Sequence, residues 1–401
     1  MEFLHNLDRR EEHTMAKNKD KKLNIAMLGH KRIPSREGGI EIVVGELATR
    51  MVEQGYNVTC YNRSGHHIAG AKFDNKKCNE YKGVRLKNVF TINIKGLAAI
   101  TSSIFASVAA AFGKYDIVHI HAEGPAFMCW LPKFMGKKVV VTIHGLDHQR
   151  AKWGKFASAY IMLGEKNAVR FSDEIIVLSR ASKQYFINVY GRKTTFIPNG
   201  VNMPVIKKAD LIKQKWGLEK NNYILFLGRI VPEKGIKYLI EAFKQVKTDK
   251  KLVIAGGSSD TNSFIDELKK TAKTDKRIIF TGFVQERILE ELYSNPYVYA
   301  LPSDLEGMPL SLLEGMSYGN CCITSNIAEC VEVVEDKAVL FEKSNISDLR
   351  DKLQMLCNNP LLVHSYKINA ADFICKKYNW DNVVKKTILL YKQAKFVRNI
   401  K

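Results

Sequence analysis

Short apolar segments alternate with helix-like segments along almost the whole chain, and this alternation constrains the fold more than any other feature. It is typical of parallel β-sheets covered by helices, because parallel strands are joined by crossover helices. The series breaks at a polar stretch near 202–210 and then starts again. The sequence therefore predicts an α/β protein of two doubly wound, Rossmann-like domains that face each other across a cleft, with a hinge around IPNGVNMP.

The predicted strands fall into two series. The first series is 23–29, 57–62, 116–121, 138–144, 174–179 and 194–199, and the second is 223–229, 251–257, 277–282, 297–303, 320–325 and 337–342. We expect four segments: 1–20 as a disordered leader, 21–201 as the N-terminal domain, 202–379 as the C-terminal domain, and 380–401 as a basic amphipathic helix.

Composition excludes several classes of protein. The 401 residues, 46% of them hydrophobic, are enough to fill two cores. The eight cysteines form no Cys-x-x-Cys pair and the histidines show no metal spacing, so we expect a reducing cytoplasm and no structural zinc. Neither a signal peptide nor a membrane span is expected, and the most apolar segment, 97–112, is predicted to be a helix that packs on the first sheet.

The formal net charge of +21 is spread along the chain, and no aromatic-basic recognition module accompanies it. This distribution argues against nucleic acid as a partner. It suits an anionic membrane surface or a phosphorylated substrate, because each basic residue near an acidic leaflet contributes about 1 kcal/mol. A merely solvated lysine-rich surface is an equally good explanation of the charge.

Two glycines follow the first predicted strand at an unusual distance. The Gly-x-Gly-x-x-Gly of nicotinamide-binding folds is absent there, and Gly38 and Gly39 instead precede an amphipathic helix at about 40–54. Paired glycines let the backbone approach a ligand, and a helix start offers free N–H groups to an anion. A flexible turn would explain the same pair.

The segment FLGRIVPEKGIKYLIEAF places two cations at one edge of the second sheet. Arg229 ends a predicted strand and Lys234 opens the next helix. A guanidinium fork and a compact ammonium converging there would clamp a diphosphate. The alternative is a pair of solvated cations with Glu233 as a surface partner.

The segment EGMPLSLLEGMSYG carries two carboxylates, Glu306 and Glu314. Pro309 has the fixed φ of a first helical residue, so the N–H groups from about Leu310 to Leu312 are expected to be free for a phosphate. Glu306 would face the cleft and accept hydrogen bonds from sugar hydroxyls, and Glu314 would grip a vicinal diol such as a ribose. An isolated Glu314 would otherwise be an ordinary exposed helix carboxylate.

Asp304 and Glu306 form an acidic-x-acidic pair, a pattern that also occurs in divalent-cation sites. Because one short loop supplies both groups and the two cations could already neutralise a diphosphate, we expect no metal here and no cofactor.

His144 closes the strand VVVTIHG at the predicted cleft, where it could hydrogen-bond a sugar hydroxyl or move a proton. His119 and His121 alternate on an earlier strand, and either could line the same edge or belong to the core.

Taken in order, these motifs resemble one family: the retaining glycosyltransferases of family 4, the glycosyl transferases group 1, with the GT-B architecture. The resemblance covers nearly all of 23–395 and rests on EGG, VVVTIHG with LDHQRAKW, IPNGV, GRIVPEKG and the Glu-seven-residues-Glu pattern of EGMPLSLLEGMSYG. The stretches HGLDHQRAKWGKFA and SNIAECVEVVEDKAVLF look like the rhamnosyl-, galactosyl- and glucosyltransferase branch that builds cell-surface polymers. Asn326 departs from the acidic residue that the family often has there.

The resemblance implies that the N-terminal domain takes the acceptor, the C-terminal domain takes the nucleotide sugar, and the last helix crosses back to the first domain. Catalytic roles would fall to His144, Arg229, Lys234 and Glu306, and donor-binding roles to Gly38, Gly39, Arg229, Lys234, Gly307, Met308, Leu310, Ser311 and Glu314. The donor would be a UDP-, GDP- or dTDP-linked sugar, the acceptor a glycan or a polyprenyl-diphosphate-linked glycan, and transfer would retain configuration without a metal. The enzyme would be cytoplasmic or peripheral on the inner membrane face.

Two rival functions remain. A sugar-nucleotide epimerase of the same architecture would convert the donor without an acceptor. A catalytically silent sugar-binding protein would have no need for Arg229, Lys234, Glu306 and Glu314 together.

Overall fold

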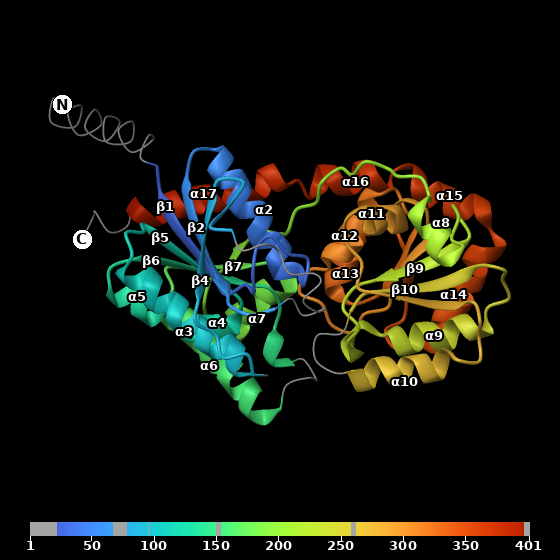
Figure 1. Ribbon diagram of the computed structural model, residues 1–401, viewed down its shortest axis with the longest axis horizontal. Coiled ribbons are helices and arrows are strands. Elements are labelled where there is room, and N and C mark those ends of the chain that lie inside the picture. Colours follow the sequence, from blue (N-terminus) through green and yellow to red (C-terminus); the bar gives the residue numbers. More distant parts are fainter. Residues whose placement is uncertain (1–21, 67–77, 95, 150–153, 258–261, 397–401) are drawn as a thin grey trace.

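The computed structural model describes residues 22–66, 78–94, 96–149, 154–257 and 262–396. The chain folds into two α/β domains, each a sheet flanked by helices on both faces (Figure 1). The predicted leader 1–20 lies outside the described residues. None of the described helices combines the length and apolar character that a bilayer crossing requires.

In the described part of the N-terminal domain the sheet has eight strands in the order β3-β4-β2-β1-β5-β6-β7-β8, all parallel except for the β3–β4 pair. The strands are β1 (Asn24–Leu28), β2 (Asn57–Arg63), β3 (Glu80–Tyr81), β4 (Val84–Val89), β5 (Ile117–His121), β6 (Lys138–Ile143), β7 (Glu174–Val177) and β8 (Thr195–Phe196). The helices are α2 (Gly39–Glu53), α3 (Leu97–Phe112), α4 (Glu123–Ala126), α5 (Trp130–Phe134), the 3-10 turn η2 (Asp147–Gln149), α6 (Lys155–Phe171) and α7 (Arg180–Tyr190).

The C-terminal domain repeats the plan with a parallel sheet whose described strands run β11-β10-β9-β12-β13-β14. The strands are β9 (Tyr223–Leu227), β10 (Lys251–Ala255), β11 (Ile278–Gly282), β12 (Val298–Leu301), β13 (Cys322–Ser325) and β14 (Val339–Phe341). The helices are α8 (Leu211–Trp216), the 3-10 turn η3 (Pro232–Lys234), α9 (Ile236–Gln245), α10 (Asn262–Ala272), α11 (Glu286–Ser294), α12 (Leu310–Ser317), α13 (Ala328–Val334), α14 (Ile346–Asn358), α15 (Pro360–Ile368), α16 (Ala370–Lys377) and α17 (Trp380–Phe396).

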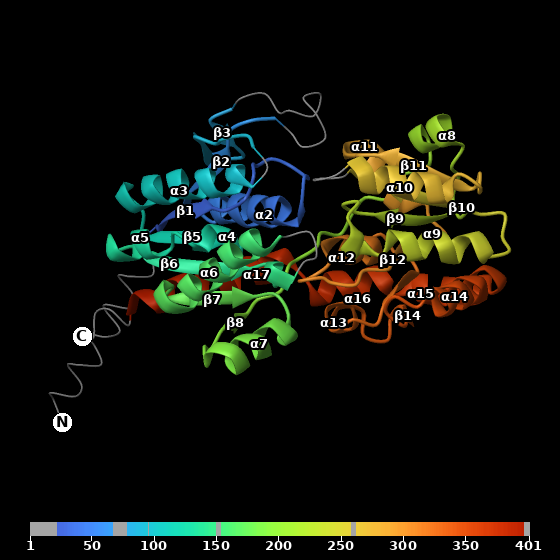
Figure 2. The ribbon, with the colours of Figure 1, turned by 90° about the horizontal axis from the view of Figure 1, so that it is seen from below.

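The last helix leaves the C-terminal domain and lies against the N-terminal one (Figures 1 and 2). Val384 and Tyr391 of α17 are fully buried in the same apolar cluster as α2 and strands β1 and β2. The two segments that connect the domains run side by side, because Val201 N donates a 2.7 Å hydrogen bond to Tyr378 O and Val201 pairs with Asn379. The hinge between the domains therefore consists of two connecting segments of the chain, which are hydrogen-bonded to each other.

Helix α3 packs on the first sheet through small residues, as the sequence predicts. Ala106 and Ala110 are buried against the strand residue Val118, whereas Phe105 and Phe112 are exposed. Cys321, just before β13, and Cys322, its first residue, are both fully buried.

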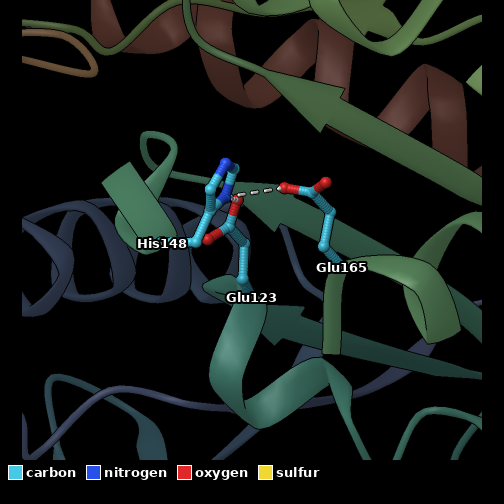
Figure 3. Close-up of side chains that lie close together, drawn as sticks. All are labelled: Glu123, His148 and Glu165. Atoms are coloured by element: carbon cyan, nitrogen blue, oxygen red, sulfur yellow. Dashed lines mark ion pairs between the residues drawn. The ribbon is translucent and has the colours of Figure 1, made fainter. Parts of the chain in front are cut away.

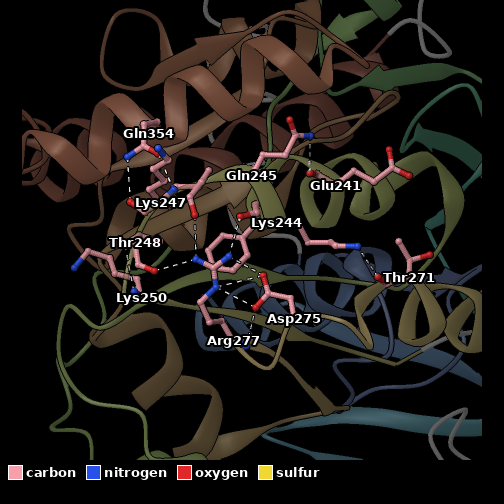
Figure 4. Close-up of polar contacts among 12 residues, drawn as sticks. Glu241, Lys244, Gln245, Lys247, Thr248, Lys250, Thr271, Asp275, Arg277 and Gln354 are labelled. Carbon is pink, nitrogen blue, oxygen red and sulfur yellow. Dashed lines mark hydrogen bonds and ion pairs between the residues drawn. The ribbon is translucent and has the colours of Figure 1, made fainter.

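The Arg277 guanidinium hydrogen-bonds the backbone just after the C-terminal end of α9 (Figure 4). Arg277, just before β11, donates to the carbonyl oxygens of Val246 at 3.0 Å and Thr248 at 2.9 Å, and it pairs with Asp275 at 2.7 Å. Carbonyls that follow a helix end lack partners within the helix. Here the contact satisfies two carbonyl oxygens of the loop after α9 and ties that loop to the residue just before β11.

Candidate active site

The cations of the C-terminal domain stand at the carboxyl end of its sheet. Lys234, the last residue of η3, forms a 2.5 Å ion pair with Glu306, and both side chains are nearly buried. Gly235 follows with φ +66°, and a Cβ there would lie 1.9 Å from Pro302 O, so only glycine lets η3 press on the end of β12. Arg229 follows β9, half-buried, with no hydrogen-bond or ion-pair partner among the described residues.

The start of α12 differs in one detail from the sequence prediction. Pro309 is the N-cap, with ψ 93°, and not the first helical residue. Leu312 N already donates to Pro309 O at 3.0 Å, so the expected free N–H at Leu312 is wrong. Leu310 and Ser311 occupy the first turn, where backbone N–H groups lack helical partners.

Glu314, in the second turn of α12, reaches across to the other domain. One carboxylate oxygen is paired with Arg36, and the other accepts a 3.0 Å hydrogen bond from Tyr293. Tyr318 stacks on the Tyr293 ring at 5.2 Å. The Glu314 carboxylate is only partly exposed. It forms its ion pair with Arg36 at the domain boundary and is not enclosed in the apolar core.

The paired glycines of the N-terminal domain lie directly opposite α12. A Cβ on Gly39 would lie 3.3 Å from Leu310 Cδ1, and one on Gly38 would lie 2.7 Å from a carboxylate oxygen of Glu41. Gly38 has extended backbone, so the pair serves close approach and not a left-handed turn. The other Glu41 oxygen accepts from Lys31 N at 2.8 Å and holds the loop in place.

The loop around Gly307 touches the end of β6. A Cβ on Gly307 would lie 1.8 Å from the carbonyl oxygen of His144 and 2.8 Å from Gly145 Cα. Next to it, Met308 Sδ accepts from the backbone N–H of Asn199 at 3.0 Å. The C-terminal loop that carries Glu306 is thus seated on the N-terminal domain.

The predicted histidines form a stack under this contact. His144 Nε2 and His121 Nδ1 share a 3.0 Å hydrogen bond, and the His119 ring lies 4.1 Å from the His121 ring. His119 belongs to the core: it is bonded to Tyr391 Oη at 2.6 Å and Thr142 Oγ1 at 2.7 Å. Burial lowers the pKa of His119 to about 3 and that of His144 to about 4, so both are neutral at pH 7. A neutral His144 suits hydrogen bonding to a hydroxyl.

Asp304 has other partners than a metal. Its carboxylate accepts from Tyr238 Oη at 3.0 Å and from Ser344 Oγ at 2.8 Å. Among the described residues, no third carboxylate, histidine or cysteine joins Asp304 and Glu306 at ligand distance. Asn326 is tied to the backbone of Lys343 at 3.0 Å, which gives it a structural role.

Sequence reasoning missed two residues of this site, Arg36 and Tyr293. Arg36 stands two positions before the paired glycines, so its place in the same loop was a usable signal. Nothing in the sequence around Tyr293 marks it, because its contact with Glu314 depends on how α11 packs beside α12.

Comparison with known proteins agrees with this architecture. The profile "Glycosyltransferase Family 4" matches residues 37–203, and "Glycosyl transferases group 1" matches 208–373. An uncharacterized glycosyltransferase of Methanocaldococcus jannaschii is 24% identical, with 93% of this chain and 98% of that protein aligned. The UDP-Gal:α-D-GlcNAc-diphosphoundecaprenol α-1,3-galactosyltransferase of Escherichia coli is 30% identical over 68% of this chain and 73% of its own length.

The fold has solved counterparts. The structure of Anabaena HepE with UDP and glucose superposes with a TM-score of 0.76, at 16% identity, over 92% of this chain and 100% of that one. The two facing Rossmann-like domains are the GT-B architecture. With both profiles matched in order and the Escherichia coli relative aligned over most of its length, the chain belongs to glycosyltransferase family 4 and is a glycosyltransferase.

Proposed function

We propose that this enzyme transfers a hexosyl or deoxyhexosyl unit from a nucleoside-diphosphate sugar to a glycan or glycolipid, with retention of anomeric configuration and without a metal at the diphosphate. The observation that carries the proposal is the Lys234–Glu306 ion pair, which lies next to the contact of Gly307 with the His144 backbone across the domain boundary. Two cations can stabilise a departing diphosphate, and the low exposure of Lys234 strengthens that effect.

Each group then has a role. Arg229 and Lys234 bind the phosphates, the N–H groups of Leu310 and Ser311 add to them, and Glu314 takes the ribose. Glu306 contacts the transferred sugar. These roles require Lys234 to exchange Glu306 for the donor phosphates and Arg36 to release Glu314 to the ribose. Release of Glu314 costs Arg36 little free energy, since a partly exposed ion pair is worth about 0–1 kcal/mol.

His144 would complete the sugar site from the other domain. Its imidazole is oriented by His121, and its backbone carbonyl lies against the Gly307 loop. A neutral imidazole beside the anomeric carbon can accept or donate a hydrogen bond to a sugar hydroxyl while the acceptor hydroxyl approaches on the same face as the leaving group.

Two observations support a cell-surface role at the inner face of the membrane. The Escherichia coli relative is named for an acceptor on diphosphoundecaprenol. The net charge of +21 favours contact with an anionic leaflet, where such an acceptor would reside.

A donor panel tests the proposal. The purified enzyme is incubated with UDP-, GDP- and dTDP-sugars without acceptor, and nucleotide release is followed by chromatography. We expect slow hydrolysis of one donor, lost in Glu306→Gln, and a product of retained configuration by NMR when a lipid-linked acceptor is added. Isomerisation of a donor without an acceptor would instead identify an epimerase, and binding without any turnover would identify a silent protein.

A further inference from the structure

Three side chains outside the donor site converge in the N-terminal domain (Figure 3). Glu123 begins α4, His148 lies in η2 and Glu165 lies in α6. His148 Nδ1 is 3.4 Å from Glu165 Oε2 and 3.9 Å from Glu123 Oε1. All three atoms lie within 4.8 Å of one another. Ligands bound about 2.1 Å from one metal ion lie roughly 3–4 Å apart, so the spacing suits a shared cation.

Each carboxylate is oriented by hydrogen bonds to one of its oxygens only. Asp147 N donates to Glu123 Oε2 at 2.9 Å, and Tyr185 and Tyr190 donate to Glu165 Oε1 at 2.9 and 2.5 Å. The other oxygens, Glu123 Oε1 and Glu165 Oε2, are buried without a hydrogen-bond partner in the described structure, and so is His148 Nδ1. Around a metal ion, hydrogen bonds from neighbouring groups usually orient the ligand side chains so that their unbonded atoms point at the ion.

The charge of the cluster demands a positive group. Both glutamate side chains are fully buried, and neither has a lysine or arginine ion-pair partner among the described residues. Taking two carboxylates out of water costs several kcal/mol per ion unless they are compensated. The compensation must therefore come from a proton or a cation.

We propose that Glu123, His148 and Glu165 bind one divalent cation of the Zn²⁺ or Mn²⁺ class through these three atoms. Two carboxylates and a neutral imidazole balance a dication and match the nitrogen and oxygen ligands that such ions take. The ion would fix η2, which starts three residues after His144, onto α4 and α6, and so hold the acceptor side of the cleft. This revises the expectation of no structural zinc. The site could not be recognised from the spacing of these residues in the sequence, because the ligands come from three separate elements.

Metal analysis of the full-length enzyme tests the site. The protein is stripped with a chelator under mild denaturant, refolded, and titrated with Zn²⁺ and Mn²⁺ by calorimetry, with bound metal counted by mass spectrometry. We expect one ion per chain. Glu165→Gln and Glu123→Gln should weaken binding at least about 100-fold, and Tyr190→Phe, which removes an orienting hydrogen bond, about tenfold. Asp304→Asn is the matched control and should keep the full stoichiometry.

A readout on the wild-type protein guards against variants that fail to fold. Co²⁺ should give visible absorption bands, and Zn²⁺ should shift the ¹⁵N resonances of His148. No bound ion in the wild-type protein would overturn the proposal and leave a proton shared by the two carboxyls. Full binding in both glutamate variants, or its loss in Asp304→Asn, would overturn it as well.

Discussion

At the residue scale, each carboxylate assigned to the donor is already occupied by a cation. Glu306 is paired with Lys234 within one domain, and Glu314 is paired with Arg36 across the two. The two pairs differ in burial, since Lys234 is 10% exposed and Arg36 is 37% exposed. The Arg36 pair is therefore the weaker one, and a bound nucleoside can replace it more easily.

Removing Arg36 should free Glu314 for the ribose. We predict that Arg36→Ala tightens binding of the product nucleoside diphosphate by about two- to fivefold, the equivalent of a partly exposed ion pair. Calorimetric titration measures the change. The control is Arg180→Ala, which removes the pair with Glu332 elsewhere on the boundary. Unchanged or weaker binding in Arg36→Ala would mean that Arg36 does not compete for Glu314.

The buried histidines make stability depend on pH. Burial lowers the pKa of His30 to about 4, whereas an unfolded histidine titrates near 6.5. Between these values the unfolded chain binds the extra proton. The contribution of His30 is therefore fully present above about pH 6.5 and is lost as the pH falls toward 4, at about 1.4 kcal/mol per pH unit.

Urea unfolding at pH 7.5, 6 and 5 measures this slope. His30→Gln should reduce the slope of the free energy of unfolding against pH by the equivalent of about one bound proton. The same change at the exposed His364 should leave the slope as it is in the wild type. An equal slope in His30→Gln and wild type would show that His30 does not stay neutral on folding.

At the element scale, α17 ties the end of the chain to the centre of the first domain. Tyr391 Oη is bonded to His119 Nδ1 at 2.6 Å in a fully buried pair. Tyr391→Phe leaves that nitrogen unsatisfied and should lower the free energy of unfolding by about 1–3 kcal/mol. Chemical denaturation measures it. Tyr366→Phe is the control, because that hydroxyl has no hydrogen-bond partner among the described residues. Equal losses in both variants would contradict the role of the His119 contact.

The elements themselves were largely predictable. Apolar runs such as YILFL are buried on both faces of a parallel sheet, so they appear in the sequence as strands. The pair β3 and β4 was missed, because β4 lies near the sheet edge and buries only Val84, Leu86 and Val89 of VRLKNV. The sequence predicts Pro309 as the first residue of α12, whereas it is the N-cap and the helix begins at Leu310. A proline fits both positions.

The pairings between elements were not predictable. Arg36 and Glu314 are 278 positions apart, and their contact depends on how the two domains meet. The same holds for Glu123, His148 and Glu165, which only the packing of α4, η2 and α6 brings together. Sequence motifs identified the groups that end strands and start helices. They contained no information on which of these groups face one another.

At the scale of the whole molecule, the contact between Gly307 and His144 defines how closely the domains approach. Gly307→Ala would place a Cβ against the carbonyl and Cα backbone of the opposite domain, which cannot yield as a side chain can. We predict a more open molecule with a larger radius of gyration by X-ray scattering. The turnover rate should fall about 100-fold, the cost of misplacing reacting groups by about 1 Å.

Gly154→Ala is the control for this prediction, because a Cβ there meets nothing within 4 Å and the φ of −67° suits alanine. A Gly307→Ala enzyme with normal turnover would show that the domains need not approach this closely for transfer.

The donor site is tested by calorimetric titration of UDP, GDP and dTDP into the wild-type enzyme and into Arg229→Ala and Lys234→Ala. We propose that these two cations bind the diphosphate at the domain boundary, so the preferred nucleotide should bind each variant about 10- to 100-fold more weakly. This is the loss expected when one charged hydrogen bond of about 1.5–3 kcal/mol is removed. Equal affinity for the wild type and both variants would contradict it.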